Sequence, residues 1–509
     1  MSKLTDDSLE FAKEHIKKYY DSDFFPKQFE FNAIWHNWAE VKSDLTSKNI
    51  EKMWVFPPKS FPAVKANGTY RIVHQLEPID SIIYTALAYL IADSVENARI
   101  PAQEKIACSY RLDIKEGSFF SDGGGYPDFD TKTSELSEKY KYILVTDITD
   151  FYNQIYLHRL NNAIEHSDSS LKNIAKDIES FLSKINGKTS QGIPVGPAAS
   201  VVMSEALMTD IDQHLQSFGA PFVRYVDDIR IFSNDLEQLD SILRELTLYL
   251  YENHRLTLSS GKTHRMEAKK YVEEYLHNPY DLEKAEIFES LEIYNPYTGE
   301  LVAYEEVEVE LDEDEAAEHA FIAALDKAIS QKSLDVGLAK GIIRRARSMN
   351  SGVLVDQLLS NFTFFLPVVS DVMIYVSQIT DDTNINSIQH HIEKISASTA
   401  MNNPLASYWL EWYIARSSIL LKGTNAINLI NVSKNIEHQA LAAITGNNLA
   451  WVRSMKTQIY NTSSKGRRAI LYATKILPSD ERTHWLRMTI GSTQFIIDKW
   501  VATWVLDTA

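Results

Sequence analysis

Two short strand-like runs separated by a pair of aspartates constrain the fold of this chain more than any other feature. The runs cover residues 222–226 and 229–232, and only Asp227 and Asp228 lie between them. Their aromatic and β-branched residues favour strands, and the two-residue separation predicts an antiparallel hairpin. We therefore expect a β-hairpin that carries both acids at its tip. Aspartate is common in hairpin turns, so the pair considered alone is explained as a polar turn.

A third aspartate follows another predicted strand. Residues 140–145 form a continuous apolar and β-branched run that leads to Asp147, and an amphipathic segment over residues 151–164 follows it. One carboxylate at a strand end and two on a neighbouring hairpin can hold two divalent cations for phosphoryl transfer. Because hard oxygen ligands prefer hard cations, the expected cofactor is Mg²⁺, with Mn²⁺ as the other possibility.

The charge balance and the single cysteine exclude several classes of protein. Lys and Arg total 51 against 69 Asp and Glu, a net charge of −18, which excludes a uniformly basic nucleic-acid coat. A lone cysteine, Cys108, allows neither an intramolecular disulfide nor a cysteine zinc site, and we expect a small buried hydrophobe. The apolar runs are shorter than a membrane span and the N-terminus is charged, so we expect a cytoplasmic protein without a membrane partner.

The pattern along the chain predicts four segments. Residues 1–50 form a helical N-terminal lead, 51–285 a mixed α+β region, 286–318 an acidic linker, and 319–509 an all-helical domain of stacked helices. Within the second segment, a Gly- and Asp-rich stretch at 115–137 is expected to be a surface loop.

Four motifs, in the right order along the chain, resemble those of reverse transcriptases. Tyr225-Val-Asp-Asp228 resembles the tyrosine-x-aspartate-aspartate signature, and Asp147-Ile-Thr-Asp-Phe-Tyr152 resembles the motif that supplies the first catalytic aspartate. Between them, Gln191-Gly-Ile-Pro-Val-Gly196 is similar to the segment beside the incoming nucleotide. After them, residues 256–263 look like the lysine-threonine element of the palm. The resemblance implies reverse-transcriptase fingers and palm over residues 51–285.

The same resemblance implies a role for each acid. Asp147 and Asp227 correspond to the two principal metal ligands, and Asp228 to the supporting acid beside them. Asp150 competes for the first role, but its place one helical step beyond the strand end favours an exposed or helix N-terminal position. Tyr152 matches the aromatic residue that crowds a ribose 2′-hydroxyl and so selects dNTPs, although a core tyrosine explains it equally well.

Nucleotide-binding residues are implied by the flanking motifs. Lys65 and Arg71 lie in a stretch that resembles the fingers segment whose cations hold the triphosphate, and Arg71 is the stronger candidate because Lys65 also fits a solvated turn. Gln191 and Gly192 match the segment beside the nucleotide. Lys262 matches the proton donor to pyrophosphate, with an ordinary surface lysine as the alternative.

Beyond residue 285 the general resemblance ends where a thumb domain would begin. Fingers and palm joined to a large helical domain resemble the abortive-infection (Abi) reverse transcriptases of bacterial phage defence, and length and motif wording are nearest to a prophage-borne member. This resemblance implies an α+β fold with an all-α, HEAT-like helical-repeat C-terminal domain. It further implies a homo-oligomer that makes single-stranded DNA from dNTPs without a template, attached covalently to a tyrosine hydroxyl of the protein.

Two alternatives stay open at this point. The first is a template-directed RNA-dependent DNA polymerase whose helical domain binds structured RNA, supported by the basic clusters at 344–347 and 465–468. These clusters are also explained as solvated helix faces or helix C-termini. The second is a catalytically silent scaffold, which the retention of three mutually repelling aspartates opposes.

Overall fold

The computed structural model describes residues 2–121, 125–276, 280, 284, 287 and 315–509. They form two compact units, each built from segments that are distant in sequence. The described residues of the first unit fall within Met1–Phe24, Leu45–Ser60 and Arg71–Val307, and those of the second within Phe25–Asp44, Phe61–Tyr70 and Glu308–Ala509. The predicted acidic linker, 286–318, lies largely outside the described residues.

The core helix of the first unit is α4 (Pro78–Ala98). Proline in its first turn suits a helix start, because the missing N–H has no partner there in any case. The helix packs against α1 (Asp6–Tyr19), α7 (Leu157–Ser167), α8 (Lys172–Ile185) and α9 (Ala198–Ser217). It is the one described helix that is long and apolar enough to cross a membrane, but most of its residues are buried inside this unit, as in any core helix.

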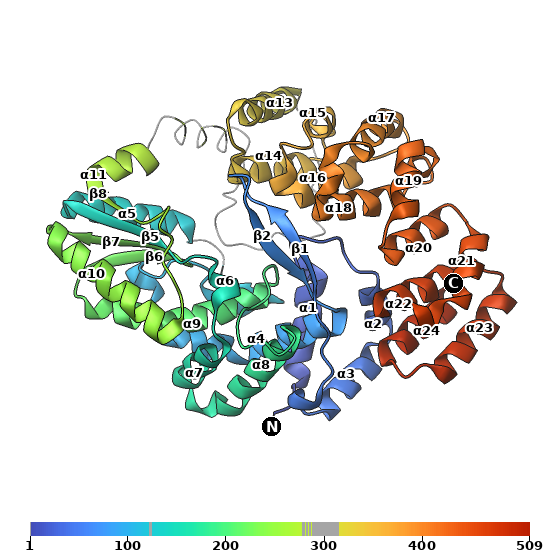
Figure 1. The fold of residues 1–509 in the computed structure, drawn as a ribbon, viewed down its shortest axis with the longest axis horizontal. Coiled ribbons are helices and arrows are strands. Elements are labelled where there is room, and N and C mark those ends of the chain that lie inside the picture. The colour runs from blue at the N-terminus through green and yellow to red at the C-terminus, as the bar shows by residue number, and fades with distance from the viewer. Residues whose placement is uncertain (1, 122–124, 277–279, 281–283, 285–286, 288–314) are drawn as a thin grey trace. The chain divides into compact units, whose positions relative to one another are not determined.

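A four-stranded antiparallel sheet lies beside these helices (Figure 1). Its strands are β5 (Tyr142–Asp147), β6 (Phe222–Tyr225), β7 (Asp228–Ser233) and β8 (His264–Glu267), in the order β6-β7-β5-β8. The two central strands, β5 and β7, consist mainly of buried residues, as their continuous apolar runs predict. Helix α5 (Tyr126–Lys139), helix α10 (Leu236–Tyr249) and the short helix α11 (Ala268–Tyr271) pack against the sheet.

The remaining short elements between residues 50 and 276 connect this framework. They are η1 (Ile50–Lys52), β1 (Lys59–Val64), β2 (Tyr70–Gln75), η2 (Ala102–Glu104), β3 (Leu112–Lys115), β4 (Ser118–Phe120), α6 (Phe151–Gln154), η3 (Ser169–Leu171), η4 (Leu250–His254) and η5 (Val272–Leu276). β1 pairs with β2, and β3 pairs with β4.

The stretch at 115–137 is not a surface loop. Its described residues include β4 and most of α5, while 122–124 lie outside the description. Phe119 and Phe129 are almost fully buried, and Phe129 packs into a cluster with Ile143 and Phe232 of the sheet. The expectation was wrong because the aromatic side chains of this stretch bury enough apolar area to order a segment that is otherwise rich in Gly and Asp.

The second unit is built from stacked helices, which confirms the expected all-helical C-terminal region (Figure 1). Helices α14, α16, α18, α20, α22 and α24 pack in succession as one row, and α15, α17 and α19 pack in succession as another. Two rows of alternating helices are the arrangement of a helical-repeat domain, in which each repeat covers the apolar face of its neighbour. The bounds are α13 (Glu315–Ser330), α14 (Val336–Ser348), α15 (Val355–Ser360), η6 (Leu366–Val368), α16 (Val369–Ile379), α17 (Ile385–Ser396), η7 (Thr399–Asn402), α18 (Pro404–Ala415), η8 (Leu420–Lys422), α19 (Thr424–Val432), α20 (Ile436–Thr445), α21 (Leu449–Thr457), η9 (Ile459–Asn461), α22 (Ser464–Ala473), η10 (Thr474–Ile476), α23 (Ser479–Ser492) and α24 (Ile496–Thr508).

The N-terminal lead is divided between the two units rather than forming its own segment. Its helices are α1, α2 (Glu30–His36) and α3 (Trp38–Ser47); α1 packs against α4, whereas α2 packs against α24. The buried carboxylate of Glu30 accepts a 2.9 Å hydrogen bond from Nε of Arg468 on α22. Helical periodicity identifies an apolar face but not the partner that covers it, so this division could not be predicted.

Candidate active site

The predicted hairpin forms, but its tip is shifted by one residue. Tyr225 at the end of β6 pairs with Asp228 at the start of β7, so the tip consists of Val226 and Asp227. The expectation that both acids lie at the tip is therefore wrong for Asp228, whose backbone continues the strand. Val226 has a φ of 54°, and a positive φ at the first tip residue alone is the pattern of a type II′ turn.

The register of the sheet brings the third aspartate to the same place. Asp147, the last residue of β5, lies directly opposite Asp228 on β7. Opposed residues on paired strands point to the same face, and like charges in such a pair destabilise the sheet. The backbone N–H of Ile148 also donates to the carbonyl of Asp227 at 3.4 Å, which joins the end of β5 to the hairpin tip. We call Asp147, Asp227 and Asp228 the carboxylate cluster.

The electrostatics of the carboxylate cluster show that its charges are not cancelled. Burial, followed by the charges of Asp147 and Asp228, raises the pKa of Asp227 from 3.8 to about 7. Burial also raises the pKa of Asp228; the positive charge of Lys262 opposes this shift, and Asp147 adds to it. Ionised carboxylates this close repel one another, so the cluster needs further positive charge to be fully ionised near neutral pH.

Lys262 is brought to the cluster by the segment that follows α10. The backbone N–H of Ser259 donates to the carbonyl of Asp147 at 2.8 Å, and a turn joins Ser259 to Lys262 through a 3.1 Å hydrogen bond. The Lys262 ammonium forms an ion pair with the Asp147 carboxylate, while its side chain remains 62% exposed. Burial lowers the pKa of Lys262, but the hydrogen bond to Asp147 and the charge of Asp228 outweigh it and raise the pKa.

The carboxylate cluster fits a divalent cation by its donor atoms. Among the residues that the structure describes, no group of three or more His, Cys, Asp or Glu side chains is arranged as a ready-formed metal site. All donors of the cluster are nevertheless hard oxygens. Burial, and then the charges of the two neighbouring carboxylates, raise the pKa of Asp227, and a bound cation would oppose both effects. The ion pair of Lys262 with Asp147 shows that the cluster already attracts positive charge. The residues therefore suit Mg²⁺, held by the three aspartates.

Tyr152 lies next to the carboxylate cluster. Its hydroxyl accepts a 3.3 Å hydrogen bond from Oγ of Ser204 on α9, and its side chain is half-buried. Burial raises its pKa strongly, and the charges of Tyr110 and Asp227 add to this shift. Asp150, two residues earlier, is exposed at the N-terminal cap of α6, as expected, and accepts a hydrogen bond from Asn153.

The Gln191 segment pairs with the chain that follows Asp147. The N–H of Gly192 donates to the carbonyl of Ile155 at 2.8 Å, and Nε2 of Gln191 donates to Oε1 of Gln154 at 2.7 Å. Gly192 has a φ of 92°, and a Cβ there would lie 3.1 Å from the Asn153 carbonyl oxygen, so this position requires glycine. The segment thus supports the backbone around Tyr152, because the side-chain amide of Gln191 donates to both the carbonyl and the side chain of Gln154.

The two predicted triphosphate ligands lie on the β1-β2 hairpin. Lys65 is in its turn, where the backbone N–H of Lys65 donates to the Thr69 carbonyl at 2.8 Å. Arg71 is exposed on β2. Three residues further along β2, His74 exchanges hydrogen bonds with Val195 of the Gln191 segment, which ties this strand to the rest of the first unit. The roles of Lys65 and Arg71 remain predictions.

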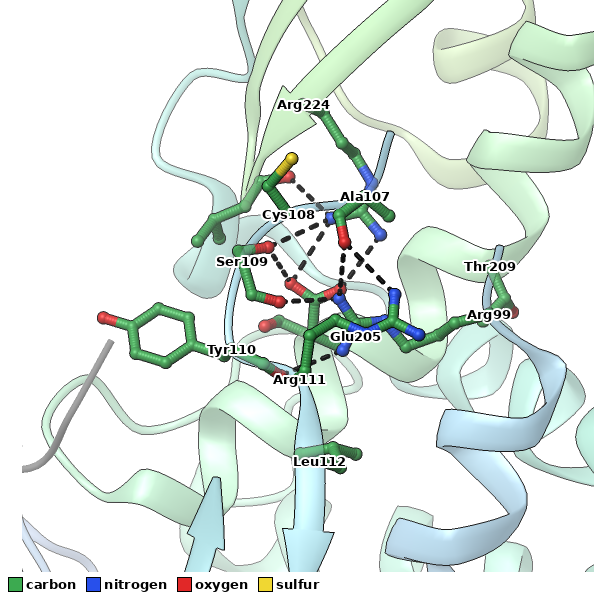
Figure 2. A network of polar contacts seen from close by, with 12 residues as sticks. Arg99, Ala107, Cys108, Ser109, Tyr110, Arg111, Leu112, Glu205, Thr209 and Arg224 are labelled. Carbon is green, nitrogen blue, oxygen red and sulfur yellow. Dashed lines mark hydrogen bonds and ion pairs between the residues drawn. The ribbon is translucent and has the colours of Figure 1, made fainter. Parts of the chain in front are cut away.

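Sequence reasoning missed a buried ion network on the other side of the hairpin strand. Figure 2 shows the guanidinium groups of Arg99 and Arg224 converging on Glu205, at 3.0 and 2.9 Å. Arg224 also makes a bidentate pair with Asp212 at 2.6 and 2.7 Å. We call Arg99, Glu205, Asp212 and Arg224 the buried ion network. The signal in the sequence is the seven-residue spacing of the two acids, which puts both on one face of α9.

Residues 109–111 join this network. Ser109 donates to Glu205 at 2.6 Å, and the carbonyl oxygens of Ser109 and Tyr110 accept hydrogen bonds from Arg99. The guanidinium of Arg111 forms an ion pair with Glu96 (Figure 2 shows the position of Arg111). Cys108 beside them is buried, as expected, and burial raises its pKa to about 12.

The arginines of the two basic clusters are half-buried or buried, so neither cluster is a solvated helix face. The cluster at 344–347 lies at the C-terminus of α14, as the other expectation had it, whereas the cluster at 465–468 lies near the start of α22. Arg344 pairs with Asp371 at 2.8 Å, and Arg347 is buried. Arg467 pairs with Asp498 at 2.8 Å, in addition to the pair of Arg468 with Glu30. Guanidinium groups held in this way contribute little positive surface for a polyanion.

Comparison with known proteins gives one family match, which covers part of the chain. Residues 63–284 match the family model described as reverse transcriptase (RNA-dependent DNA polymerase). This part of the chain is a reverse transcriptase domain, the chain is a nucleotidyltransferase, and the expected fold class, such a domain followed by a helical region, is confirmed. None of the curated proteins matches the sequence.

Solved structures give weaker similarities. Apo telomerase from Candida tropicalis is 11% identical, with a TM-score of 0.32 over 92% of this chain and 74% of its own. Telomerase with a TWJ fragment of telomeric RNA gives TM-scores of 0.33 for Candida albicans (11% identity, 75% of this chain, 71% of its own) and 0.35 for Candida tropicalis (10%, 77%, 70%). Scores this low indicate neither a shared function nor a shared partner.

Proposed function

We propose that this chain is a phage-defence DNA polymerase of the abortive-infection type, which adds deoxynucleotides from dNTPs to a tyrosine hydroxyl of the protein without copying a template. The carboxylate cluster at the ends of β5 and β7 is the observation that carries the polymerase part of this proposal. The proposal also includes a homo-oligomer that works in the cytoplasm, where dNTPs are present. Template independence and protein priming rest on the family resemblance and on the helical region that follows the palm.

Each residue of the site has a definable part in nucleotidyl transfer. Two divalent cations, when held by the carboxylate cluster, would activate the attacking hydroxyl and neutralise the leaving pyrophosphate. Asp147 and Asp228 present their carboxylates from opposed strands, and Asp227 presents a third from the tip. The exposed ammonium of Lys262 is placed to give a proton to the leaving pyrophosphate.

Selection of deoxynucleotides is assigned to Tyr152. Its hydroxyl accepts a hydrogen bond from Ser204, and its ring packs edge-to-face with Phe151, so the aromatic ring has a fixed position. A fixed ring next to the reacting centre leaves less room for a ribose 2′-hydroxyl than for hydrogen. The proposed nucleotide site also includes Lys65, Arg71, Gln191 and Gly192. The side chains of Lys65 and Arg71 bind phosphate oxygens.

In the first step of the proposed reaction, a tyrosine oxygen attacks the α-phosphorus of a dNTP. An O–P bond to the protein forms, the bond to pyrophosphate breaks, and the phenol proton is lost to solvent. Of the two tyrosines at the end of α1, Tyr20 is buried and its hydroxyl accepts from Gln75 at 3.3 Å, whereas Tyr19 is half-buried. Tyr19 is therefore the better acceptor of this pair.

The test is incorporation without nucleic acid. Nuclease-treated protein is incubated with labelled dNTPs and Mg²⁺, and the products are separated under denaturing conditions with and without protease. We expect label that migrates with the protein and grows in mass, and none with Asp227→Asn. Label that leaves the protein under denaturant alone, or that forms only after a template is added, would overturn template-independent protein priming.

The same assay addresses the template-directed alternative. That enzyme would incorporate dNTPs only with an added RNA or DNA template, and its products would be complementary to it. The basic clusters that favoured this alternative in the sequence are engaged in internal ion pairs, so no structural observation adds to it.

A further inference from the structure

The tip of the hairpin is held in a conformation that its own residue disfavours. Val226 has a φ of 54°, a region that a β-branched residue rarely adopts and that a type II′ turn normally fills with glycine. Such a conformation is strained and persists only when the surroundings determine it. Because Asp227 is the next residue, the conformation of Val226 decides where that carboxylate points.

A single side chain bonds to this strained residue from within the hairpin strand. Nη1 of Arg224 donates to the carbonyl oxygen of Val226 at 3.3 Å. The backbone of Arg224 is itself fixed, because its N–H donates to Ile106 at 2.8 Å and its carbonyl accepts from Cys108 at 3.0 Å. The guanidinium therefore reaches the tip from a strand that cannot easily move.

The rest of the buried ion network fixes the direction of that guanidinium. Asp212 accepts from Nε and Nη2, and Glu205 accepts from Nη1 and Nη2 at 3.3 and 2.9 Å. Arg224 is fully buried, as is Glu205, and Asp212 is 1% exposed. With Arg99 the network holds two positive and two negative groups, so its charges balance without help from outside.

Stability alone does not explain why such a network is present. Burying four charges carries a large desolvation cost, and ion pairs of this kind seldom stabilise a fold more than apolar side chains of the same volume would. What they supply is a defined geometry, because a bidentate guanidinium has one orientation that satisfies both carboxylates. Besides the acids and Ser109, the guanidinium of Arg224 bonds to the carbonyl oxygen of Val226 at the hairpin tip.

We propose that Arg224 is a positioning residue for the carboxylate cluster: held by the buried ion network, it fixes the carbonyl of Val226 and so sets the direction of Asp227. This inference rests on the proposed function for its effect on catalysis, but its structural part does not. Arg224 itself touches neither substrate nor cation.

The test is a cycle of Arg224→Lys and Val226→Gly. Lysine keeps the positive charge but lacks the guanidinium that bonds to both acids and to the Val226 carbonyl. Val226 should therefore relax from its positive φ. Glycine accepts that φ without strain, so Val226→Gly should restore an Arg224→Lys protein. Arg468→Lys is the matched control, because Arg468 is an equally buried arginine paired with an acid, Glu30, in the second unit.

Two readouts separate positioning from general stability. The first is amide hydrogen exchange of a peptide covering residues 225–229, which needs no activity. The second is the Mg²⁺ concentration for half-maximal dNTP incorporation. We expect Arg224→Lys to raise both the exchange rate and the half-maximal Mg²⁺ concentration about tenfold, Val226→Gly to reverse most of each change, and Arg468→Lys to alter neither.

Several outcomes would overturn the inference. Unchanged exchange at 225–229 in Arg224→Lys would do so, as would an increase that Val226→Gly does not reverse or that Arg468→Lys reproduces. If Arg224→Lys fails to fold, Asp212→Asn takes its place in the cycle. That substitution weakens the hold on the guanidinium but keeps the arginine. If the wild-type protein incorporates no dNTP, the proposed function fails, and the exchange rates still decide the inference.

Discussion

Two groups of acids beside the β6-β7 hairpin differ in how far positive charge compensates them. One is the pair Glu205 and Asp212 on α9, and the other is the carboxylate cluster. In the buried ion network each acid meets a guanidinium. The charges of Arg224 and Arg99 outweigh burial and lower the pKa of Glu205, whereas burial outweighs the charge of Arg224 and raises the pKa of Asp212. In the carboxylate cluster three acids face the ammonium of Lys262, and the pKa of Asp227 is raised to about 7. The alternation of side chains along β6 and β7 places the two groups on opposite faces of the sheet.

This difference distinguishes acids that stabilise the folded state from acids that take part in the proposed reaction. A charge-balanced network is complete within the protein, so removing one member leaves a buried charge without its partner. An unbalanced cluster is incomplete, so removing one member relieves repulsion. The two groups should therefore respond in opposite ways to the same substitution, and this contrast can be measured.

The largest expected effect is on catalysis by the carboxylate cluster. Asp227→Asn or Asp147→Asn should lower dNTP incorporation roughly a thousandfold or more, because one cation ligand is lost. The folded state should be kept, since the remaining acids repel one another less. Incorporation of labelled dNTP and thermal unfolding of the same samples check both statements. Near wild-type incorporation by a well-folded double variant would remove the basis of the assignment.

The second prediction compares stability between the two groups. Glu205→Gln should lower the free energy of unfolding by about 3–5 kcal/mol, because it leaves two buried guanidinium groups with too little negative charge. Asp228→Asn, an identical kind of change in the cluster, should leave the free energy of unfolding unchanged or raise it. Urea denaturation of both variants without divalent cations measures the difference. Equal losses would show that the cluster acids are also structural.

The third prediction concerns Tyr152, the proposed sugar-selecting residue. Tyr152→Val should weaken the preference for dNTPs over NTPs by roughly tenfold, since removal of a ring frees space for a 2′-hydroxyl at a cost of about 1.4 kcal/mol in discrimination. The ratio of incorporation efficiencies for dATP and ATP measures this. Tyr152→Phe is the control, because it keeps the ring and loses only the bond to Ser204. Unchanged selectivity in Tyr152→Val would make Tyr152 a core residue.

The smallest expected effect is a pH dependence that only the cluster should show. The folded protein holds the Asp227 proton more tightly than the unfolded chain, because its pKa rises from 3.8 to about 7. This stabilisation is fully present below about pH 4 and is lost as the pH rises through 7. Without divalent cations, the Tm should therefore fall from pH 5.5 to 8 more in wild type than in Asp227→Asn, and Mg²⁺ at pH 8 should remove the difference. Parallel pH profiles would contradict the raised pKa.

Much of the palm could be predicted because its signals are local. Apolar runs of strand length and a two-residue gap fix a hairpin, and the carboxylate at the end of residues 140–145 follows from the same pattern. The error of one residue at the tip arose because Asp228 joins the strand, and backbone pairing is not a property of the residue type. The burial of Phe119 and Phe129 was missed because the Gly and Asp residues around them dominated the local composition.

The amino-acid sequence is enough to identify the candidate catalytic residues. The residues that position them are identified only by the tertiary structure. Hard-oxygen side chains, turn residues and helix periodicity can be read one segment at a time, so Asp147, Asp227 and Asp228 stand out in the chain. Arg224 does not, because its importance comes from Glu205 and Asp212 on a different element and from the φ of Val226. The split of the N-terminal lead and the pairing of the basic clusters are of the same kind. Contacts between distant segments depend on which apolar faces and charges meet after folding, and only the folded chain specifies them.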